Sequence, residues 1–446
     1  MRHNYNERGI TLIALIITII ILVILAAVSI RAVYNMSIVG HAINGTQQYA
    51  ERAKEENKML GDTVNVIEST LGKLDNIQNG KGSGESGNSG AGNTTNALAE
   101  FQTETTKPYM PSSDFTHVTG TSLTNGLVIE DTNVVGLGNQ FVWIEVPRTT
   151  GNTGVYKTAG LNIKGFSDTE LEAIKTDLIA YATTYRESSY SDTYSSGCGL
   201  ADETAYNNLY KKMLKSVYEN GGFWIGRYET GYAYDDPAIT AQGGGLRTYG
   251  TDYYTEHPTT HKAIIKANAY PYNWVRQSQA QSLSSGIHSG ECESSLLFGI
   301  QWDLVLRYLE SKGVTQAELR GGDATGSSNW GNYSNVGFDV KNANAKYTTD
   351  FGANWSDATT YEKPSSSVLL TTGANETRNS KQNICDLAGN VQERTLENET
   401  SVTSDPYVIR GGNYFFNGSN NPACYRRGSS TTNSSYTVGF RVTLFK

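Results

Sequence analysis

The stretch that most restricts the fold of this chain is residues 407–444, close to the end of the sequence. Its two ends are short apolar runs beside glycine, at residues 408–412 and 438–442, and this pattern predicts short buried strands. Residues 413–436 between them are mostly Asn, Ser, Thr, Tyr and Gly, which seldom fill a core. Tyr gives rigid contact area, and Asn and Ser give adaptable hydrogen bonds. The pattern therefore predicts a stiff frame that carries a polar contact surface.

The frame and the surface have different expected roles. In the frame, Gly411 and Gly412 would allow close backbone approach, Phe440 would enter the core, and Arg410 and Arg441 would pair with carboxylates. On the surface, a set of side chains is expected to point outward together and to bind a ligand: Asn413, Tyr414, Asn417, Ser419, Asn420, Asn421, Ser429, Thr431, Asn433, Ser435 and Tyr436. An ordinary set of polar loops is the alternative.

Several short motifs resemble those of one protein family. RGGNY at 410–414, CYRR at 424–427 and GFRV at 439–442 resemble the closing motifs of the formylglycine-generating-enzyme (sulfatase-modifying factor) domain. FWIGRYE at 223–229 and DLAGNVQE at 386–393 are similar to earlier motifs of that family, in the same order. The resemblance implies an α+β head with a C-type-lectin-like fold, in which long irregular loops surround few regular elements.

The same resemblance bears on catalysis. The oxygen-dependent enzymes of this family use two cysteines in the closing segment, and Cys424 matches the second of them. Phe416 stands where the first would be, so the copper–thiolate site of the enzyme cannot form in the same way. We therefore expect a binding protein with no catalytic residues, and neither copper nor iron. A sulfatase-modifying oxidoreductase, or another modifying enzyme of the family, is the alternative.

Two further properties are implied by the resemblance. In some proteins of this lectin-like fold, a retroelement diversifies the stretch between the two Gly motifs, and residues 413–436 are similar to such a variable region. The ligand would then be an extracellular protein or a glycan. Residues 386–393 resemble the family's calcium loop, which would bind Ca²⁺ through Asp386 and the backbone of Gly389, Val391 and Glu393. A tight turn without metal is the alternative.

The N-terminal part of the chain predicts a membrane anchor. Residues 10–30 carry no charge, and a helix of that length spans about 31 Å, enough to cross a bilayer core. We therefore predict a transmembrane helix over residues 10–31. Arg2 and Arg8 precede the uncharged run, which favours a cytoplasmic N-terminus and a head outside the cell membrane.

The residues around the start of this run resemble a type IV prepilin processing site. RGITLIAL at 8–15 implies a nine-residue leader, residues 1–9, and a prepilin peptidase that cuts after Gly9 and methylates Ile10. Pilins of this class usually carry Glu at the fifth mature position, where this chain has Ala14, so polymerisation with other pilin subunits is in doubt. A minor pilin or pseudopilin that serves as a structural subunit is the alternative to an anchored display protein.

The rest of the chain divides by composition. Residues 32–78 predict a helical stalk, residues 79–97 a flexible Gly/Ser linker, and residues 98–446 the head. Within the head, the expected elements are strands at 141–147 and 223–229, a helix opened by a capping box at 167–170, a helix that ends before 221, a polar loop region at 232–295, and a buried helix at 296–309.

Charge and cysteine content exclude some functions. The formal net charge of −8 argues against nucleic acid as a partner, because such proteins carry a clustered basic face. The four cysteines, Cys198, Cys292, Cys385 and Cys424, form no CxxC pair, so a zinc knuckle is not expected. Four cysteines allow three disulfide pairings, and the sequence leaves these and four buried thiols open.

The first prediction concerns processing at Gly9. Native protein from cells with an active prepilin peptidase should begin at methylated Ile10, as measured by N-terminal sequencing or intact mass. The variant Gly9→Val should keep its leader, because the peptidase cuts after the glycine. A native chain that begins at Met1 in such cells would contradict the prediction.

Overall fold

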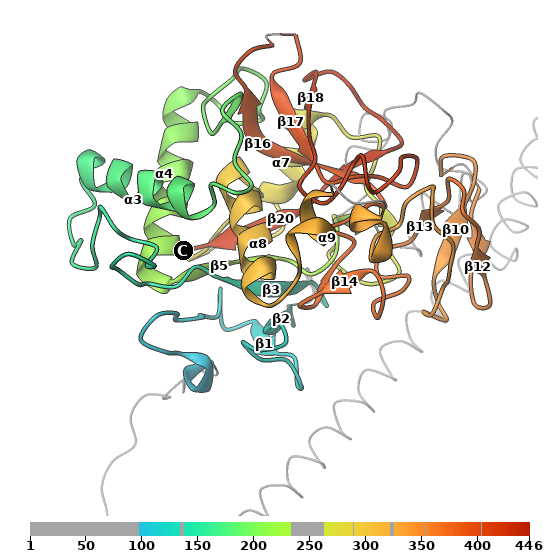
Figure 1. Cartoon of the computed structure of the whole chain (residues 1–446), viewed down its shortest axis with the longest axis horizontal. Helices are drawn as coiled ribbons and strands as arrows, with labels where there is room; N and C mark the ends of the chain where they lie inside the picture. The colour runs from blue at the N-terminus through green and yellow to red at the C-terminus, as the bar shows by residue number, and fades with distance from the viewer. Residues whose placement is uncertain are drawn as a thin grey trace, which may run out of the picture. The chain divides into compact units, whose positions relative to one another are not determined.

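The computed structural model describes residues 98–133, 138–232, 263–288, 290–321, 325–352, 354–402 and 404–446. All of them belong to the second of two compact units, which spans residues 93–446 (Figure 1). The predicted leader, transmembrane helix, stalk and linker, residues 1–97, lie outside the described residues. Among the described residues, none of the helices has both the length and the apolar composition needed to span a bilayer.

An antiparallel sheet of six strands forms one half of the head (Figure 1). Its strands, in spatial order, are β1 (Phe115–His117), β2 (Val128–Asp131), β3 (Gln140–Glu145), β5 (Gly222–Gly226), β20 (Val442–Phe445) and β8 (Glu293–Leu296). The strands predicted at 141–147 and 223–229 are thus confirmed as β3 and β5, although both end earlier than predicted. The last strand of the chain, β20, lies inside the sheet, between β5 and β8.

Two helices whose ends are set by local signals pack near this sheet. Helix α3 (Asp168–Tyr181) begins with the predicted capping box, in which Ser167 and Glu170 bond each other's backbone amide and side chain. Helix α4 (Glu203–Asn220) ends at Gly221, whose φ of 65° is the left-handed conformation that glycine adopts without strain. Both predictions are confirmed, because each signal lies within a few residues of the helix end.

The buried helix predicted at 296–309 starts later than expected. Residue 296 closes strand β8, and helix α8 runs from Gly299 to Ser311. The carboxylate of Asp192 caps α8, accepting hydrogen bonds from Gly299 N at 2.6 Å and Ile300 N at 3.0 Å. Because this cap lies more than 100 residues upstream, no pattern around residue 299 could reveal it.

The described part of the polar region at 232–295, residues 232, 263–288 and 290–295, is also more regular than predicted. It contains helix α7 (Gln277–Ser285) and strand β7 (Tyr270–Pro271), which pairs with β6 (Gly231–Tyr232). Helix α7 is held from a distance, since Gln277 Nε2 donates to Thr395 O at 2.9 Å and Gln281 Oε1 accepts from Leu296 N at 3.1 Å. The expectation of a loop was therefore wrong over this helix, whose polar sequence gave no apolar stripe.

A second sheet lies in the C-terminal half of the head (Figure 1). Its order is β18 (Arg426–Ser429), β17 (Tyr407–Arg410), β16 (Gln392–Glu399) and β19 (Val438–Phe440), with β4 (Tyr190–Ser191) paired to the end of β16. Only the pair β16–β19 is parallel. The remaining elements are short: η1 (Ala99–Phe101), α9 (Gln316–Arg320), η2 (Gly326–Asn329), β9 (Phe338–Asp339), β10 (Lys346–Thr348), β11 (Ser356–Asp357), β12 (Glu362–Lys363), β13 (Leu369–Leu370), β14 (Ser380–Lys381) and β15 (Ile384–Cys385). The described head is therefore α+β.

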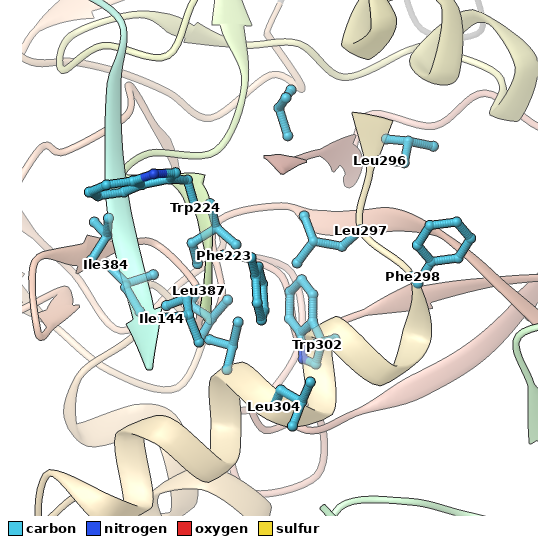
Figure 2. Packing of buried hydrophobic residues seen from close by; sticks show 14 of the residues in the cluster. Ile144, Phe223, Trp224, Leu296, Leu297, Phe298, Trp302, Leu304, Ile384 and Leu387 are labelled. Carbon is cyan, nitrogen blue, oxygen red and sulfur yellow. The ribbon is translucent and has the colours of Figure 1, made fainter. Parts of the chain in front are cut away.

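Helix α8 contacts both sheets, through β3 and through β16. Figure 2 shows Trp302 of α8 close to Phe223 of β5 and to Leu297, with Leu387 nearby. All four side chains are buried. Burial of a large apolar side chain stabilises the fold by about 1.5–3 kcal/mol. Helix α8 therefore joins the two sheets into one core.

A buried ion network crosses the same region. Arg410 donates to Glu397 at 2.8 Å and to Asp303 at 2.9 Å, and Arg426 donates to the same two carboxylates at 3.1 and 2.5 Å. Arg186 bonds both as well, and also Asp192. Burial alone would raise the pKa of Glu397, but the arginines outweigh it and hold that pKa at about 2. Glu397 therefore stays charged, and the network ties α8 to β16, β17 and β18.

The second prediction concerns this network. Asp303→Asn removes one carboxylate from three arginines, and breaking a buried ion pair typically costs about 3–5 kcal/mol. Chemical denaturation of the full-length chain should show a loss of that size. The control Asp339→Asn breaks a solvent-exposed pair with Lys341 and should cost less than about 1 kcal/mol. Equal losses in the two variants would contradict the prediction.

Candidate binding surface

The 413–436 segment lies between β17 and β19 and contains β18. The residues that flank the segment have the structural roles predicted for them. A Cβ on Gly412 would lie 2.1 Å from Asn421 O, so only glycine fits there. Phe440 is buried, and the guanidinium of Arg441 bonds both oxygens of Glu393 at 2.6–3.1 Å. The predicted structural roles of the flanking residues are confirmed.

The backbone of the 413–436 segment is held by residues outside it. Ser334 Oγ donates to Phe416 O at 2.9 Å, and Trp302 Nε1 donates to Ala423 O at 3.1 Å. Near the other end, three further carbonyls accept hydrogen bonds from the frame: Asn433 O from Arg394 Nη2, Ser435 O from Trp274 N, and Tyr436 O from Asn273 Nδ2. Because these bonds go to backbone atoms, they do not depend on which side chains the segment carries.

Three of the predicted ligand-binding side chains do not lie on the surface. Asn413 is fully buried and donates to Gln392 Oε1 at 2.8 Å. Tyr414 is 2% exposed, because its ring packs with Leu369 and Val391 in a small apolar cluster, and burial raises the pKa of its hydroxyl. Ser429 is buried at the end of β18, opposite Tyr407. For these three, the prediction that they point outward was wrong.

The other predicted side chains are half-buried or exposed: Asn417, Ser419, Asn420, Asn421, Thr431, Asn433, Ser435 and Tyr436. Asn417 shapes its own turn, since its side-chain oxygen accepts from both the amide and the hydroxyl of Ser419 at 2.8 Å. Asn420 and Asn433 are the most accessible. These residues lie on two stretches, 417–421 and 431–436, on either side of β18. Their binding role stays a prediction.

Sequence reasoning predicted Tyr436 on this surface but missed three aromatic side chains beside it, those of Phe351, Phe415 and Phe416. Phe415 and Phe416 are 40% and 39% exposed, and Leu161 is the only other exposed large apolar side chain among the described residues. The ring of Phe415 lies 5.9 Å from that of Phe416 and 6.0 Å from that of Tyr436. The ring of Phe351 lies 4.4 Å from Tyr436. We call Phe351, Phe415, Phe416 and Tyr436 the aromatic platform.

Phe351 joins the aromatic platform in an unusual conformation. Its φ of 67° lies in the left-handed region, which bulky residues seldom adopt and which costs on the order of 1–3 kcal/mol. The turn that holds it is fixed by Asp350, whose carboxylate bonds Thr348 and Asn354 at 2.6 Å. The adjacent Phe-Phe pair at 415–416 was the available sequence signal. Because phenylalanine is normally buried in a core, this pair would have suggested burial, whereas both side chains are exposed.

The residues predicted to bind calcium lie near the buried side of this surface. Asp386 is 3% exposed, and its Oδ2 accepts from Gly373 N at 2.7 Å. Burial raises the pKa of Asp386 to about 7. Among the described residues, nothing donates to the carbonyls of Gly389 and Val391, so these oxygens suit a cation. Glu393 differs, because its backbone lies between β17 and β19 in the sheet. The calcium site stays a prediction.

All four cysteines are thiols, so none of the three disulfide pairings is formed. Cys198, Cys292 and Cys385 are buried, and Cys424 is half-buried. Burial raises the pKa of Cys424, although Arg410 and Arg426 oppose the effect. A raised pKa lowers the fraction of reactive thiolate. This favours a structural role for Cys424.

Comparisons with known proteins give distant likenesses only. No protein-family model matches the chain, and no curated protein matches it. Among solved structures, the chain is similar to the crystal structure of CarF, with 13% identity over 50% of this chain and 87% of that chain and a TM-score of 0.28. It is also similar to Treponema denticola variable protein 1, with 13% identity over 51% and 85% and a TM-score of 0.25.

The third prediction concerns metal removal. If Asp386, Gly389 and Val391 bind Ca²⁺, chelation should lower the melting temperature of the full-length chain, because an ion that binds the native state stabilises it. The variant Asp386→Asn should lose most of this response. An unchanged melting temperature after chelation, with no ion found by elemental analysis, would leave residues 386–393 as a plain turn.

Proposed function

We propose that this chain is a surface-displayed binding protein, anchored in the cell membrane or on a pilus, whose head binds an extracellular protein or glycan without catalysing a reaction. One observation carries the proposal. The frame holds the 413–436 segment by its backbone, while polar side chains and the exposed pair Phe415 and Phe416 remain at the surface. Exposed aromatic side chains on a rigid support are typical of binding hot spots.

The proposed fold of the head is C-type-lectin-like. It is supported by the motifs at 410–414, 424–427 and 439–442, which fall on β17, on β18 and on β19 with β20. These motifs supply the buried Arg410, Arg426 and Arg441. A diversified 413–436 segment would suit such a frame, because surface substitutions that leave backbone contacts intact usually cost under about 0.5 kcal/mol.

The charge of the 413–436 segment limits the class of ligand, because the segment itself has no acidic side chain, although the carboxylate of Asp350 lies next to Phe351 in the chain. Residues 406–446 contain no Asp or Glu, although the whole chain has a net charge of −8, and Arg427 is exposed within the segment. Complementary charge favours association with the correct partner and slows association with others. We therefore propose a ligand whose contact face is apolar with neutral or acidic polar groups around it.

The proposed location rests on the sequence. The uncharged run at 10–30 and the prepilin-like residues 8–15 support a single membrane anchor that is processed at Gly9. Ala14 supports display over assembly into a filament. The enzyme alternative is weakened by Phe416, because it stands at the sequence position where the resemblance would place the first cysteine of an oxidising enzyme.

The fourth prediction tests the aromatic platform. The double variant Phe415→Ala/Phe416→Ala should bind at least ten-fold more weakly than the native chain to hits from a glycan array and a panel of extracellular proteins, since truncated hot-spot aromatics cost about 2 kcal/mol or more. Its melting temperature should stay within a few degrees of the native value, because both side chains are exposed.

The matched control is Leu161→Ala, which removes an equally exposed apolar side chain outside the aromatic platform. It should leave binding unchanged. Full binding by the double variant, or an equal loss in the control, would place the binding surface elsewhere.

A further inference from the structure

Lys363, at the end of β12, is a buried lysine without a carboxylate partner. Its side chain is 1% exposed, and no carboxylate among the described residues forms an ion pair with it. Its Nζ instead lies within hydrogen-bond distance of four backbone carbonyls: Tyr333 O at 2.9 Å, Val336 O at 2.7 Å, Pro364 O at 3.0 Å and Ser366 O at 3.0 Å. This is an unusual environment, since buried charges are normally paired with an opposite charge.

The geometry fits an ammonium and not a neutral amine. An ammonium has three N–H donors, which can be shared among four carbonyl oxygens, whereas a neutral amine has two. Rings of backbone carbonyls are also how proteins replace the hydration shell of a monovalent cation. The side chain of Lys363 therefore supplies the positive charge at the centre of a carbonyl cage, which we define by Tyr333, Val336, Pro364 and Ser366.

The carbonyl cage bears directly on the binding surface. Two of its members, Tyr333 and Val336, bracket Ser334 and Asn335 in the chain. Ser334 donates to Phe416 O from both its amide and its hydroxyl, each at 2.9 Å. Asn335 accepts from Gly418 N at 3.2 Å. Ser334 and Asn335 thus bond the backbone of residues 416–418. In the chain they lie between Tyr333 and Val336, whose carbonyls both accept hydrogen bonds from Lys363.

We propose that Lys363 is a positioning residue for the binding surface: its ammonium acts as a tethered cation that fixes residues 333–336 and, through them, Phe416. The importance of this role for ligand binding rests on the function proposed above, whereas the positioning itself does not. Loss of the cation would leave the carbonyls of Tyr333, Val336 and Ser366 without a donor among the described residues, whereas Pro364 O would keep its bond from Ser366 N. It would also release Ser334 and Asn335 from their places.

A half-buried cation, Arg378, supports the residues just before this loop. Arg378 donates to Gly331 O at 2.9 Å and to Ser328 O at 2.5 Å. Its guanidinium lies 4.2 Å from the ring centre of Phe338, and the Nζ of Lys363 lies 5.5 Å from the same centre. The effect of Lys363 should therefore be confined to residues 333–336, because Arg378 holds residues 328–331 independently.

The first experiment measures hydrogen exchange in the full-length chain. Lys363→Gln keeps a polar side chain with two N–H donors but removes the charge. The amide of Ser334 should exchange at least ten-fold faster in this variant, and peptides that cover 413–421 should lose protection. Burial lowers the pKa of Lys363 to about 7, so the comparison is made at pH 6, where the native amine is mostly protonated.

The matched control is Lys341→Gln, which removes an exposed lysine from the neighbouring chain segment. It should leave exchange at Ser334 unchanged. Native exchange at Ser334 in Lys363→Gln would overturn the proposal. This readout needs no ligand, so a failed ligand search would count against the proposed function and not against the role of Lys363.

The second experiment is chemical rescue. Lys363→Ala removes the atoms of a propylammonium ion, so added propylammonium should raise the melting temperature of this variant, or restore its folding if it does not fold alone. Tetramethylammonium carries the same charge without N–H donors and should have no such effect. The native chain should respond to neither cation. No rescue by propylammonium, or equal rescue by both cations, would overturn the proposal.

Discussion

The buried network of Arg186, Arg410 and Arg426 with Asp192, Asp303 and Glu397 is the interaction on which the C-terminal half of the head depends. Removing buried arginines and carboxylates from water is costly, and the cost is offset only when each group finds close partners. The need for close partners therefore restricts the relative positions of these side chains as well as contributing to the free energy of folding. Helix α8, strands β16 to β18 and the residues on both sides of β4 must adopt one relative arrangement for all of these ion pairs to form.

This requirement explains how the head can present an irregular surface. Apolar packing tolerates small shifts, but an arginine that bridges two carboxylates tolerates fewer, because its planar donors must meet both acceptors at once. The 413–436 segment is therefore fixed by charge at Arg410 before it and at Arg426 of β18 within it, and by packing and charge together at Phe440 and Arg441 after it. The segment between them can be polar and loop-like without loosening the fold. The frame contributes hydrogen bonds to the backbone of the segment, and the side chains are left for recognition.

The sequence predicted those features whose causes are local. The capping box of Ser167 and Glu170, the stop at Gly221 and the strand pattern of residues 141–147 each involve neighbours in the chain. The family-like motifs also located the buried arginines. The start of α8 was missed because its cap, Asp192, comes from a distant loop. Helix α7 was missed because distant partners, and not an apolar stripe, stabilise it.

The binding surface was predictable in position but not in detail. Composition marked residues 413–436, yet Tyr414 is buried and Phe415 is exposed, the reverse of what their side chains suggest. The difference lies in the tertiary neighbours: Leu369 and Val391 form a pocket for Tyr414, whereas the next two side chains point away from it. Lys363 gave no signal, because its four partners are backbone carbonyls from two loops.

The place of β20 has a consequence for association between molecules. Residues 442–445 pair with β5 on one side and with β8 on the other, so β20 covers one edge of each of these strands. If β20 were displaced, both edges would be open, and open edges invite pairing with other chains. Substitutions that loosen β20 would therefore promote aggregation as well as lower the stability of the head.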